Sequence, residues 1–316
     1  MSISCSSLFL DSGAHSLYTE YVIKRFLGRQ KKKKLTQKQI MRMIAKKRDF
    51  SWYKDKVFLD YVDKYAEFVH KHKKGLDFYV TVDVIFNPEQ SWEILKYLER
   101  EWGLNPLPVI HYGTDLKWFN RHIDAGYDFI GIGGLGQETH KGDYFEWADR
   151  VFNYLCPRPS RLPIVKCHGF AMTAWELLVR YPWWSVDSAS WIKAGAFGSL
   201  YIPKKTKGEY DFTGKPPWVV AISDGSSAIQ KGIHYQSYKQ RNKPLAKIME
   251  EWVEYLGMPY GKTDNCGDSI EWGVFSDFTA RSVANACYFE MLSKALPEWP
   301  WSFDRRVVSR GFNISL

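Results

Sequence analysis

Six short apolar runs, each ending in a polar residue or a glycine, recur along the first two thirds of this chain. Stretches with a helical spacing of apolar residues lie between them. Continuous apolar runs are typical of parallel strands buried on both faces, and strands that alternate with helices pair in parallel through right-handed crossovers. This rhythm predicts an α/β protein. The runs are SLFLDSG (7–13), DFYVTVD (77–83), PVIHYG (108–113), DFIGIGG (128–134), PIVKCHG (163–169) and WWSVDSA (183–189).

The helical patterns between these runs complete the fold prediction. The strongest, at 56–72, predicts an amphipathic helix whose apolar face carries Phe58, Tyr61, Val62, Tyr65, Phe68 and Val69. Further helices are expected at 91–103, 115–125, 144–155, 173–180, 237–256 and 277–295. Two weaker strands, at 197–202 and 218–223, would bring the number of strands to eight. We therefore predict a single (β/α)8 TIM-barrel domain over 1–316, with a doubly wound open sheet as the alternative.

Three segments are expected to extend the barrel. A basic helical insertion at 24–50 follows the first strand. The polar, turn-rich loop at 203–217 is expected to protrude as a hairpin, and residues 237–316 are expected to form a C-terminal helical region.

The composition excludes several classes of protein. A hydrophobic content of 45% with 25% charged residues is usual for a soluble globular chain of 316 residues. The sequence contains no apolar run of about 18 residues, the length of a membrane span, and its N-terminus does not read as a signal peptide. The five cysteines are odd in number and far apart, which favours free thiols and a cytoplasmic location.

The positive charge of the chain is concentrated in one segment. The net charge of the chain is +9. The segment from Lys24 to Arg48 carries twelve Lys and Arg residues and no acidic residue, so its charge alone exceeds the net charge of the chain. A basic block of this kind predicts contacts with a phosphate backbone, above all from Lys31, Lys32, Lys33 and Lys34. A solvated helix face or a localisation signal is the alternative interpretation.

Three of the six runs end in an aspartate: Asp11, Asp83 and Asp187. The carboxyl ends of the strands of an α/β barrel meet on one face, which is where such barrels hold their active sites. A carboxylate among β-forming residues is costly unless it is paired or binds a ligand. Each aspartate alone is also compatible with a structural role such as a helix cap. Together they predict an active site at the strand ends.

Two histidines and a glycine run also end strands. His111 and His168 would be suitable metal ligands beside the aspartates, or hydrogen-bonded core residues, or contacts to a substrate. Gly133 and Gly134 permit either the close approach of a flat ligand or tight strand–helix packing.

These motifs resemble those of the tRNA-guanine transglycosylases. LFLDSGAHS is similar to their DSGGFQ motif, GIGGL to their base-pocket glycine loop, VKCHGFAMT to their strand ending in LMGVG, and SVDSASW to the strand that bears their nucleophilic aspartate. The motifs of one branch of this family, which is found in phages and bacteria and exchanges guanine in DNA for 7-deazaguanine bases, are more similar still. The resemblance lies in DSGAHS, HYG, GGL, HGF and YPWWSVDSASW. The resemblance covers about the first two hundred residues.

The resemblance implies a TIM barrel and a base-exchange reaction. Asp187 would attack C1′ of the target nucleotide, and Asp11 would transfer protons to the leaving guanine and from the incoming base. Asp83 would bind the purine edge with help from Gly133 and Gly134, and His111 occupies the position of a base-reading glutamine. The remaining pocket residues implied by the same motifs are Ser12, His15, His168 and Gly169.

The chain departs from the family at two places. His15 and His168 stand where the family stacks the base between Phe and Met, so two imidazoles would sandwich it. The CxCxxC…His zinc motif of the tRNA enzymes is absent, and Cys266 and Cys287 lie too far apart to replace it, so we expect no metal cofactor. Because that zinc subdomain supports tRNA binding, its loss favours DNA over tRNA as the partner.

The expected substrates are therefore DNA and a free 7-deazaguanine base, in the cytoplasm of a bacterial or phage-infected cell, with no membrane involved. Lys204 and Lys205 in the later loop are expected to contact the same nucleic acid as the basic block. The sequence does not indicate an oligomeric state. The alternatives are a tRNA enzyme, a non-catalytic nucleic-acid-binding homologue, and a metal-dependent hydrolase with Asp11, Asp83, His111 and His168 as ligands.

Overall fold

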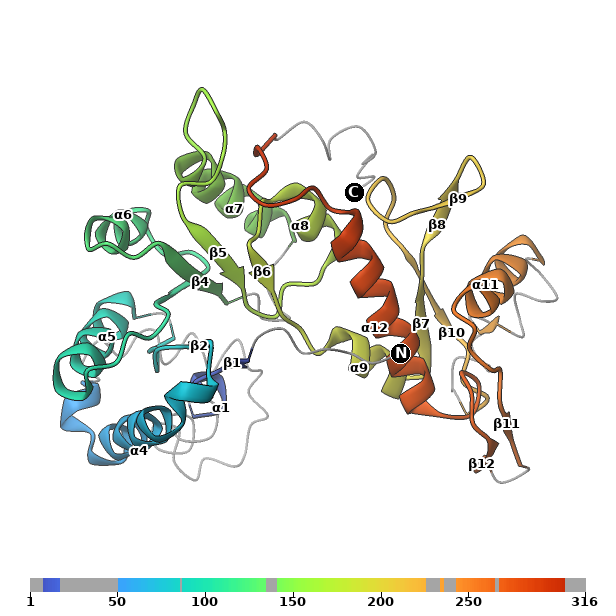
Figure 1. Ribbon diagram of the computed structural model, residues 1–316, viewed down its shortest axis with the longest axis horizontal. Coiled ribbons are helices and arrows are strands. Elements are labelled where there is room, and N and C mark those ends of the chain that lie inside the picture. The colour runs from blue at the N-terminus through green and yellow to red at the C-terminus, as the bar shows by residue number, and fades with distance from the viewer. Residues whose placement is uncertain are drawn as a thin grey trace, which may run out of the picture. The chain divides into compact units, whose positions relative to one another are not determined.

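The computed structural model describes residues 8–17, 51–85, 87–134, 141–225, 234–235, 243–264 and 267–304 (Figure 1). The basic insertion predicted at 24–50 lies outside these residues. The chain divides into two compact units, which we describe one at a time. Unit 1 is Met1–Phe170 with Trp183–Val186, and unit 2 is Ala171–Pro182 with Asp187–Leu316.

In the part of unit 1 that the structure describes, six parallel strands follow the order of the chain. β1 pairs with β2, β3 to β6 form a four-stranded sheet in the order β3-β4-β5-β6, and a parallel bridge between Val80 and Leu107 joins the two sets. The α/β class is therefore confirmed. A doubly wound sheet would reverse its strand order partway across, and no reversal occurs among these strands. The strands are β1 (Phe9–Leu10), β2 (Phe78–Tyr79), β3 (Val109–His111), β4 (Phe129–Gly133), β5 (Lys166–Gly169) and β6 (Ser185–Val186).

The sheet of unit 1 is strongly curled. Phe9 on β1 stacks on His168 on β5, with ring centroids 4.5 Å apart. In a flat sheet these two strands, four positions apart, would be separated by roughly 19 Å. Phe78 on β2 likewise contacts Trp184, just before β6, at 5.5 Å. The inner face of the sheet is therefore closed over a core of aromatic side chains.

Helices follow the strands of unit 1 at nearly the predicted places. The helix expected at 56–72 is confirmed at both ends as α4 (Lys56–His72), with Asp55 as N-cap accepting from the Phe58 backbone N–H. The prediction that Phe68 belongs to the buried apolar face of this helix is wrong. The Phe68 side chain is about half exposed and lies against His72. The other elements are α1 (Ala14–Leu17), η2 (Trp52–Lys54), η3 (Lys73–Gly75), α5 (Pro88–Trp102), α6 (Lys117–Asp124) and α7 (Lys141–Leu155).

Unit 2 is built differently. Its two predicted strands are β7 (Ser199–Ile202) and β10 (Trp218–Ala221), and they pair antiparallel. The expectation that both serve as the seventh and eighth strands of a parallel barrel is therefore wrong. The hairpin expected at 203–217 is confirmed by β8 (Lys204–Thr206) and β9 (Glu209–Asp211), which pair antiparallel. The remaining elements are α8 (Trp175–Arg180), α9 (Ser190–Ala196), α11 (Lys243–Tyr255), β11 (Lys262–Thr263), β12 (Ser269–Glu271) and α12 (Phe278–Ala295).

The long helix α12 lies along α9 and β7 and holds them through buried polar side chains (Figure 1). Asn285 is fully buried and covers one edge of β7. Its Oδ1 accepts from the Tyr201 backbone N–H at 2.8 Å, and its Nδ2 donates to the carbonyls of Ser199 and Trp191 at 3.1 Å each. Its amide thus supplies the partners that a further strand would give to this edge.

No helix among the described residues is long and apolar enough to cross a membrane.

Replacing Asn285 tests the part played by this edge cover. Asn285→Ala leaves one partly buried N–H and two partly buried carbonyls without the amide, so we expect the free energy of unfolding to fall by about 3 kcal/mol. Urea denaturation monitored by circular dichroism measures it. The control is Val283→Ala on the exposed side of α12, which should change stability by about 0.5 kcal/mol or less. Equal losses for the two variants would contradict the assignment.

Candidate active site

The turn that carries Asp11 is built around Gly13. Its φ of +68° lies in the left-handed region, and a Cβ there would come within 2.7 Å of the Tyr61 hydroxyl oxygen. The same hydroxyl donates to the Ser12 carbonyl at 2.7 Å, and the Ser12 Oγ accepts from the Ala14 backbone N–H at 3.3 Å. The Asp-Ser-Gly turn is thus clamped while Asp11 itself stays exposed at the end of β1.

Two tyrosines of α4 support the ends of β1 and β2. Tyr61 and Tyr65 lie one helical turn apart, and the Tyr65 hydroxyl donates to the Val80 carbonyl at 2.5 Å. Burial raises the pKa of both phenols, and the negative charge of Asp11 raises it further. Both therefore stay neutral donors beside Asp11. The sequence placed them on the apolar face of the helix, and the helical pattern gave no signal for their second role.

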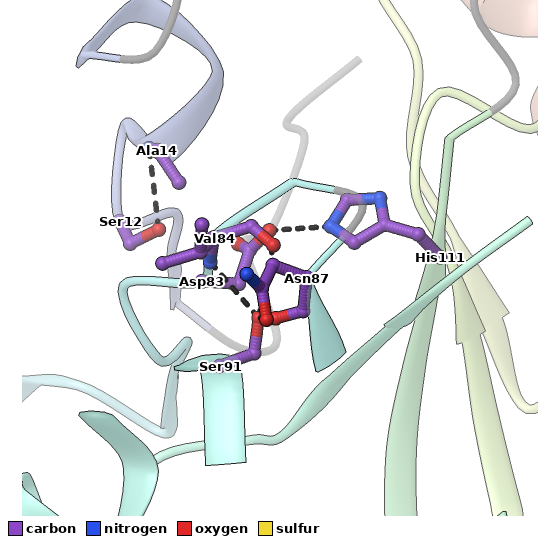
Figure 2. A network of polar contacts seen from close by, with 7 residues as sticks. All are labelled: Ser12, Ala14, Asp83, Val84, Asn87, Ser91 and His111. Carbon is purple, nitrogen blue, oxygen red and sulfur yellow. Dashed lines mark hydrogen bonds and ion pairs between the residues drawn. The ribbon is translucent and has the colours of Figure 1, made fainter. Parts of the chain in front are cut away.

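Asp83 and His111 form a buried pair at the ends of neighbouring strands. The Asp83 carboxylate, 6% exposed, is hydrogen-bonded through Oδ2 to His111 Nε2 (Figure 2). The loop after Asp83 is held by Ser91 on α5, whose Oγ accepts from the Val84 backbone N–H at 2.9 Å. Asn87 caps the same helix, with its Oδ1 accepting from the Gln90 backbone N–H. Both partners of the pair are thus fixed by regular structure on either side.

The glycines after β4 make room for the His111 ring. His111 and Gly133 face each other in the β3–β4 ladder, and a Cβ on Gly133 would lie 3.2 Å from the imidazole Cε1. A Cβ on Gly134, whose φ is +91°, would lie 3.3 Å from Nδ1 of the same ring. In this structure the flat group that these glycines accommodate is an imidazole of the protein itself.

His168 lies in the interior of the curled sheet. It is buried, stacks on Phe9, and meets Phe170 edge-on with ring centroids 4.6 Å apart. Its Nδ1 is hydrogen-bonded to Ser185 Oγ at 2.8 Å. The next residue, Gly169, is buried as well and pairs with Val186 on β6. The His168 imidazole, which was expected to stack on a base, thus stacks on Phe9 in this structure. The stacking of His168 on a base stays a prediction.

Asp187, the predicted nucleophile, belongs to unit 2 and is exposed. Its Oδ1 accepts from the Ala171 backbone N–H at 2.9 Å, and its carbonyl accepts from the Met172 N–H at 2.8 Å. Ala171 has a φ of +54°, which is strained for a residue with a Cβ. The Asp187 carboxylate therefore holds a strained turn while remaining open to solvent.

Unit 1 thus brings together Ser12 beside Asp11, and Asp83, His111, Gly133 and Gly134 in one contact group, with His168 and Gly169 further inside the sheet. The side chain of His15 and the whole of Lys31–Lys34 lie outside the described residues. Lys205 donates to Glu251 at 2.6 Å, whereas Lys204 holds its ammonium 4.3 Å from the centre of the Trp218 ring.

The described cysteines are poor metal ligands. Burial raises the pKa of Cys156 to about 12 and raises those of Cys167 and Cys287 above the usual value, so all three stay protonated thiols. Within the described ranges, no group of three or more His, Cys, Asp or Glu side chains is arranged to hold a metal ion. Cys266 lies outside the described residues, and the absence of a metal cofactor stays a prediction.

Comparison of the chain with protein-family models, curated proteins and solved structures finds no match. The function inferred for this chain therefore rests on its own residues and geometry.

Gly13→Ala tests how tightly the Asp11 turn is clamped. We expect it to lower the free energy of unfolding by about 2–3 kcal/mol, because the left-handed φ and the contact with Tyr61 both penalise a Cβ. Chemical denaturation measures the loss. Gly103→Ala is the matched control, since Gly103 has a φ of +60° and open space around its Cβ, and it should lose only about 1 kcal/mol. Identical losses would show that Tyr61 does not confine the turn.

A double-mutant cycle tests the buried pair. Replacing Asp83 and His111 by alanine, singly and together, should give a coupling free energy of about 2 kcal/mol, because each group is buried without its partner in the single variants. The exposed pair of Glu290 and Lys294 on α12 serves as reference and should couple by about 0.5 kcal/mol or less. A coupling for Asp83 and His111 no larger than this reference would mean that the pair is not formed in solution.

Proposed function

We propose that this protein is a DNA-guanine transglycosylase, which exchanges guanine in DNA for a 7-deazaguanine base through a covalent aspartyl-glycosyl intermediate. The observation that carries the proposal is the difference in setting among the three strand-end aspartates. Asp11 follows the first strand and Asp187 follows the sixth, and both are exposed, whereas Asp83 is buried and paired. Attack and proton transfer need accessible carboxylates, and base recognition needs a fixed one.

We further propose that the six parallel strands belong to a closed barrel of the TIM type. Their unbroken chain order and their curl around an aromatic interior support this, because both are properties of such barrels.

The first half of the reaction breaks the bond between C1′ and N9 of guanine. A carboxylate oxygen of Asp187 bonds to C1′, and the electron pair of the glycosidic bond passes to the departing base. Asp11, protonated, gives its proton to that base, which leaves as neutral guanine. The product is a glycosyl ester on Asp187, as in retaining glycosidases.

The second half reverses these events with a new base. Asp11, now a carboxylate, takes the N9 proton of the incoming 7-deazaguanine, whose N9 bonds to C1′ as the Asp187 ester is broken. Two inversions give net retention at C1′. Neither step needs a metal ion or a redox cofactor.

Asp83 and His111 are proposed to read the base. A carboxylate accepts hydrogen bonds only, so it suits N1–H and the exocyclic amine of guanine and disfavours adenine, which presents an acceptor at N1. His111 engages Oδ2 of Asp83 and leaves Oδ1 to meet the base. The target guanine must be flipped out or single-stranded, because a base within a duplex cannot reach the buried Asp83 and His111.

DNA is proposed as the nucleic acid because the chain lacks the zinc motif of the tRNA enzymes and concentrates its positive charge between Lys24 and Arg48. A polyanionic substrate accounts for this charge.

Trapping tests the proposed chemistry. The protein is incubated with guanine-containing DNA in the absence of free base and examined for an adduct that survives denaturation. We expect Asp187→Asn to abolish the adduct, and Asp11→Asn to slow its formation by about 10²–10⁴-fold because the leaving base loses its acid. The exposed Asp60 on α4 supplies the control, and Asp60→Asn should form the adduct at the rate of the unmodified protein.

A chase with a free 7-deazaguanine base should release the adduct and leave the modified base in the DNA. An adduct that persists in Asp187→Asn would reject Asp187 as the nucleophile. Adduct formation with tRNA alone would replace DNA by tRNA as the substrate.

A further inference from the structure

The hairpin in unit 2 presents its lysines on two opposite faces. Successive side chains of a strand alternate in direction, so Lys204 and Lys205 point to different sides of β8. Lys205 faces α11, where it pairs with Glu251 and lies 4.8 Å from the Tyr210 ring centre. This lysine is therefore occupied within the protein.

Lys204 lies on the other face with Trp218. Trp218 pairs with Ile202 in the β7–β10 ladder, and Lys204 follows two residues after Ile202, so both side chains share one face as diagonal neighbours. The Lys204 ammonium lies 4.3 Å from the Trp218 ring centre, and among the described residues it forms no ion pair. Trp218 is 42% exposed, and its neighbour Val219 is 57% exposed. We call Lys204 and Trp218, together with Lys207 in the turn of the hairpin, the hairpin surface.

The tip of the hairpin adds a third feature. Lys207 and Gly208 form its two-residue turn, with φ values of +53° and +91°. A turn with two left-handed residues is usually built with asparagine or aspartate before the glycine, and a lysine there is strained. Lys207 is exposed in this turn, and the β8–β9 hairpin extends beyond β7 and β10 (Figure 1).

Two acidic residues lie on β9: the exposed Glu209, next to the turn, and Asp211. Asp211 is engaged inside the hairpin, since it accepts from Thr206 Oγ1 at 2.7 Å and from the Gly214 backbone N–H at 2.6 Å. The hairpin surface thus combines an exposed indole with two ammonium groups. This combination fits a single nucleic-acid strand, whose bases stack on aromatic rings while its phosphates meet cations.

We infer that the hairpin surface binds a single-stranded part of the DNA substrate, with Trp218 stacking on a base and Lys204 and Lys207 contacting phosphates. The inference rests on the proposed function for the identity of the strand, but binding is measured without any chemistry. A strand is favoured over a duplex because a base is free to stack only where it is unpaired.

Fluorescence anisotropy with a labelled single-stranded oligonucleotide and the full chain tests the inference. We expect Trp218→Ala to weaken binding about tenfold and Trp218→Phe to restore most of it, because the loss of stacking is the cause. With an abasic strand of the same length, which keeps the phosphates, Trp218→Ala should bind like the unmodified protein. Lys204→Gln should lower the slope of log affinity against log salt by about 0.7, the value for one phosphate contact on a single strand.

Lys205→Gln is the matched control, since the neighbouring lysine is held by Glu251, and its salt slope should be unchanged. Thermal unfolding of each variant shows that the fold is kept. The inference is overturned if Trp218→Ala binds the base-containing strand as tightly as the unmodified protein, or if it weakens binding to the abasic strand equally. Binding through Trp218 with no adduct on Asp187 would reject the proposed reaction and keep the hairpin surface. An adduct on Asp187 together with unchanged DNA binding in Trp218→Ala would reject the hairpin surface and keep the proposed reaction.

Discussion

The stacking of Phe9 on His168 is the contact on which the arrangement of unit 1 depends. It joins the first and fifth strands of a parallel sheet, and only a strongly curled sheet brings such strands together. The curl constrains the backbone as well, since a Cβ on Gly131 would come within 2.5 Å of the Phe170 ring. Because all six strands run parallel, their carboxyl ends gather along one rim of this curled sheet.

The rim is held in place by groups that do no chemistry themselves. Tyr61 and Tyr65 reach from α4 to the first and second strand ends, and Ser91 reaches from α5 to the loop after Asp83. Their hydrogen bonds go to backbone atoms, so they fix the course of the chain beside Asp11 and Asp83. A loop without these donors would not hold Asp11 and Asp83 in constant positions.

The three aspartates lie in different environments, and these match the different roles proposed for them. Asp83 is withdrawn from water and bound to His111, which suits recognition because its direction is fixed. Asp11 and Asp187 remain exposed, and Asp187 also holds the left-handed Ala171 turn through a backbone N–H. A carboxylate already oriented by a backbone donor needs little reordering before it reacts.

The sequence by itself determined what depends on neighbours along the chain: the alternation of strands and helices and the ends of α4. It also located the strand-end aspartates, because apolar runs end where strands end. Only the tertiary structure decided that β7 and β10 pair antiparallel, that His111 binds Asp83, and that Lys205 pairs with Glu251 while Lys204 lies over Trp218. These outcomes depend on partners from distant parts of the chain, and a periodic pattern records which face is apolar but not what covers it.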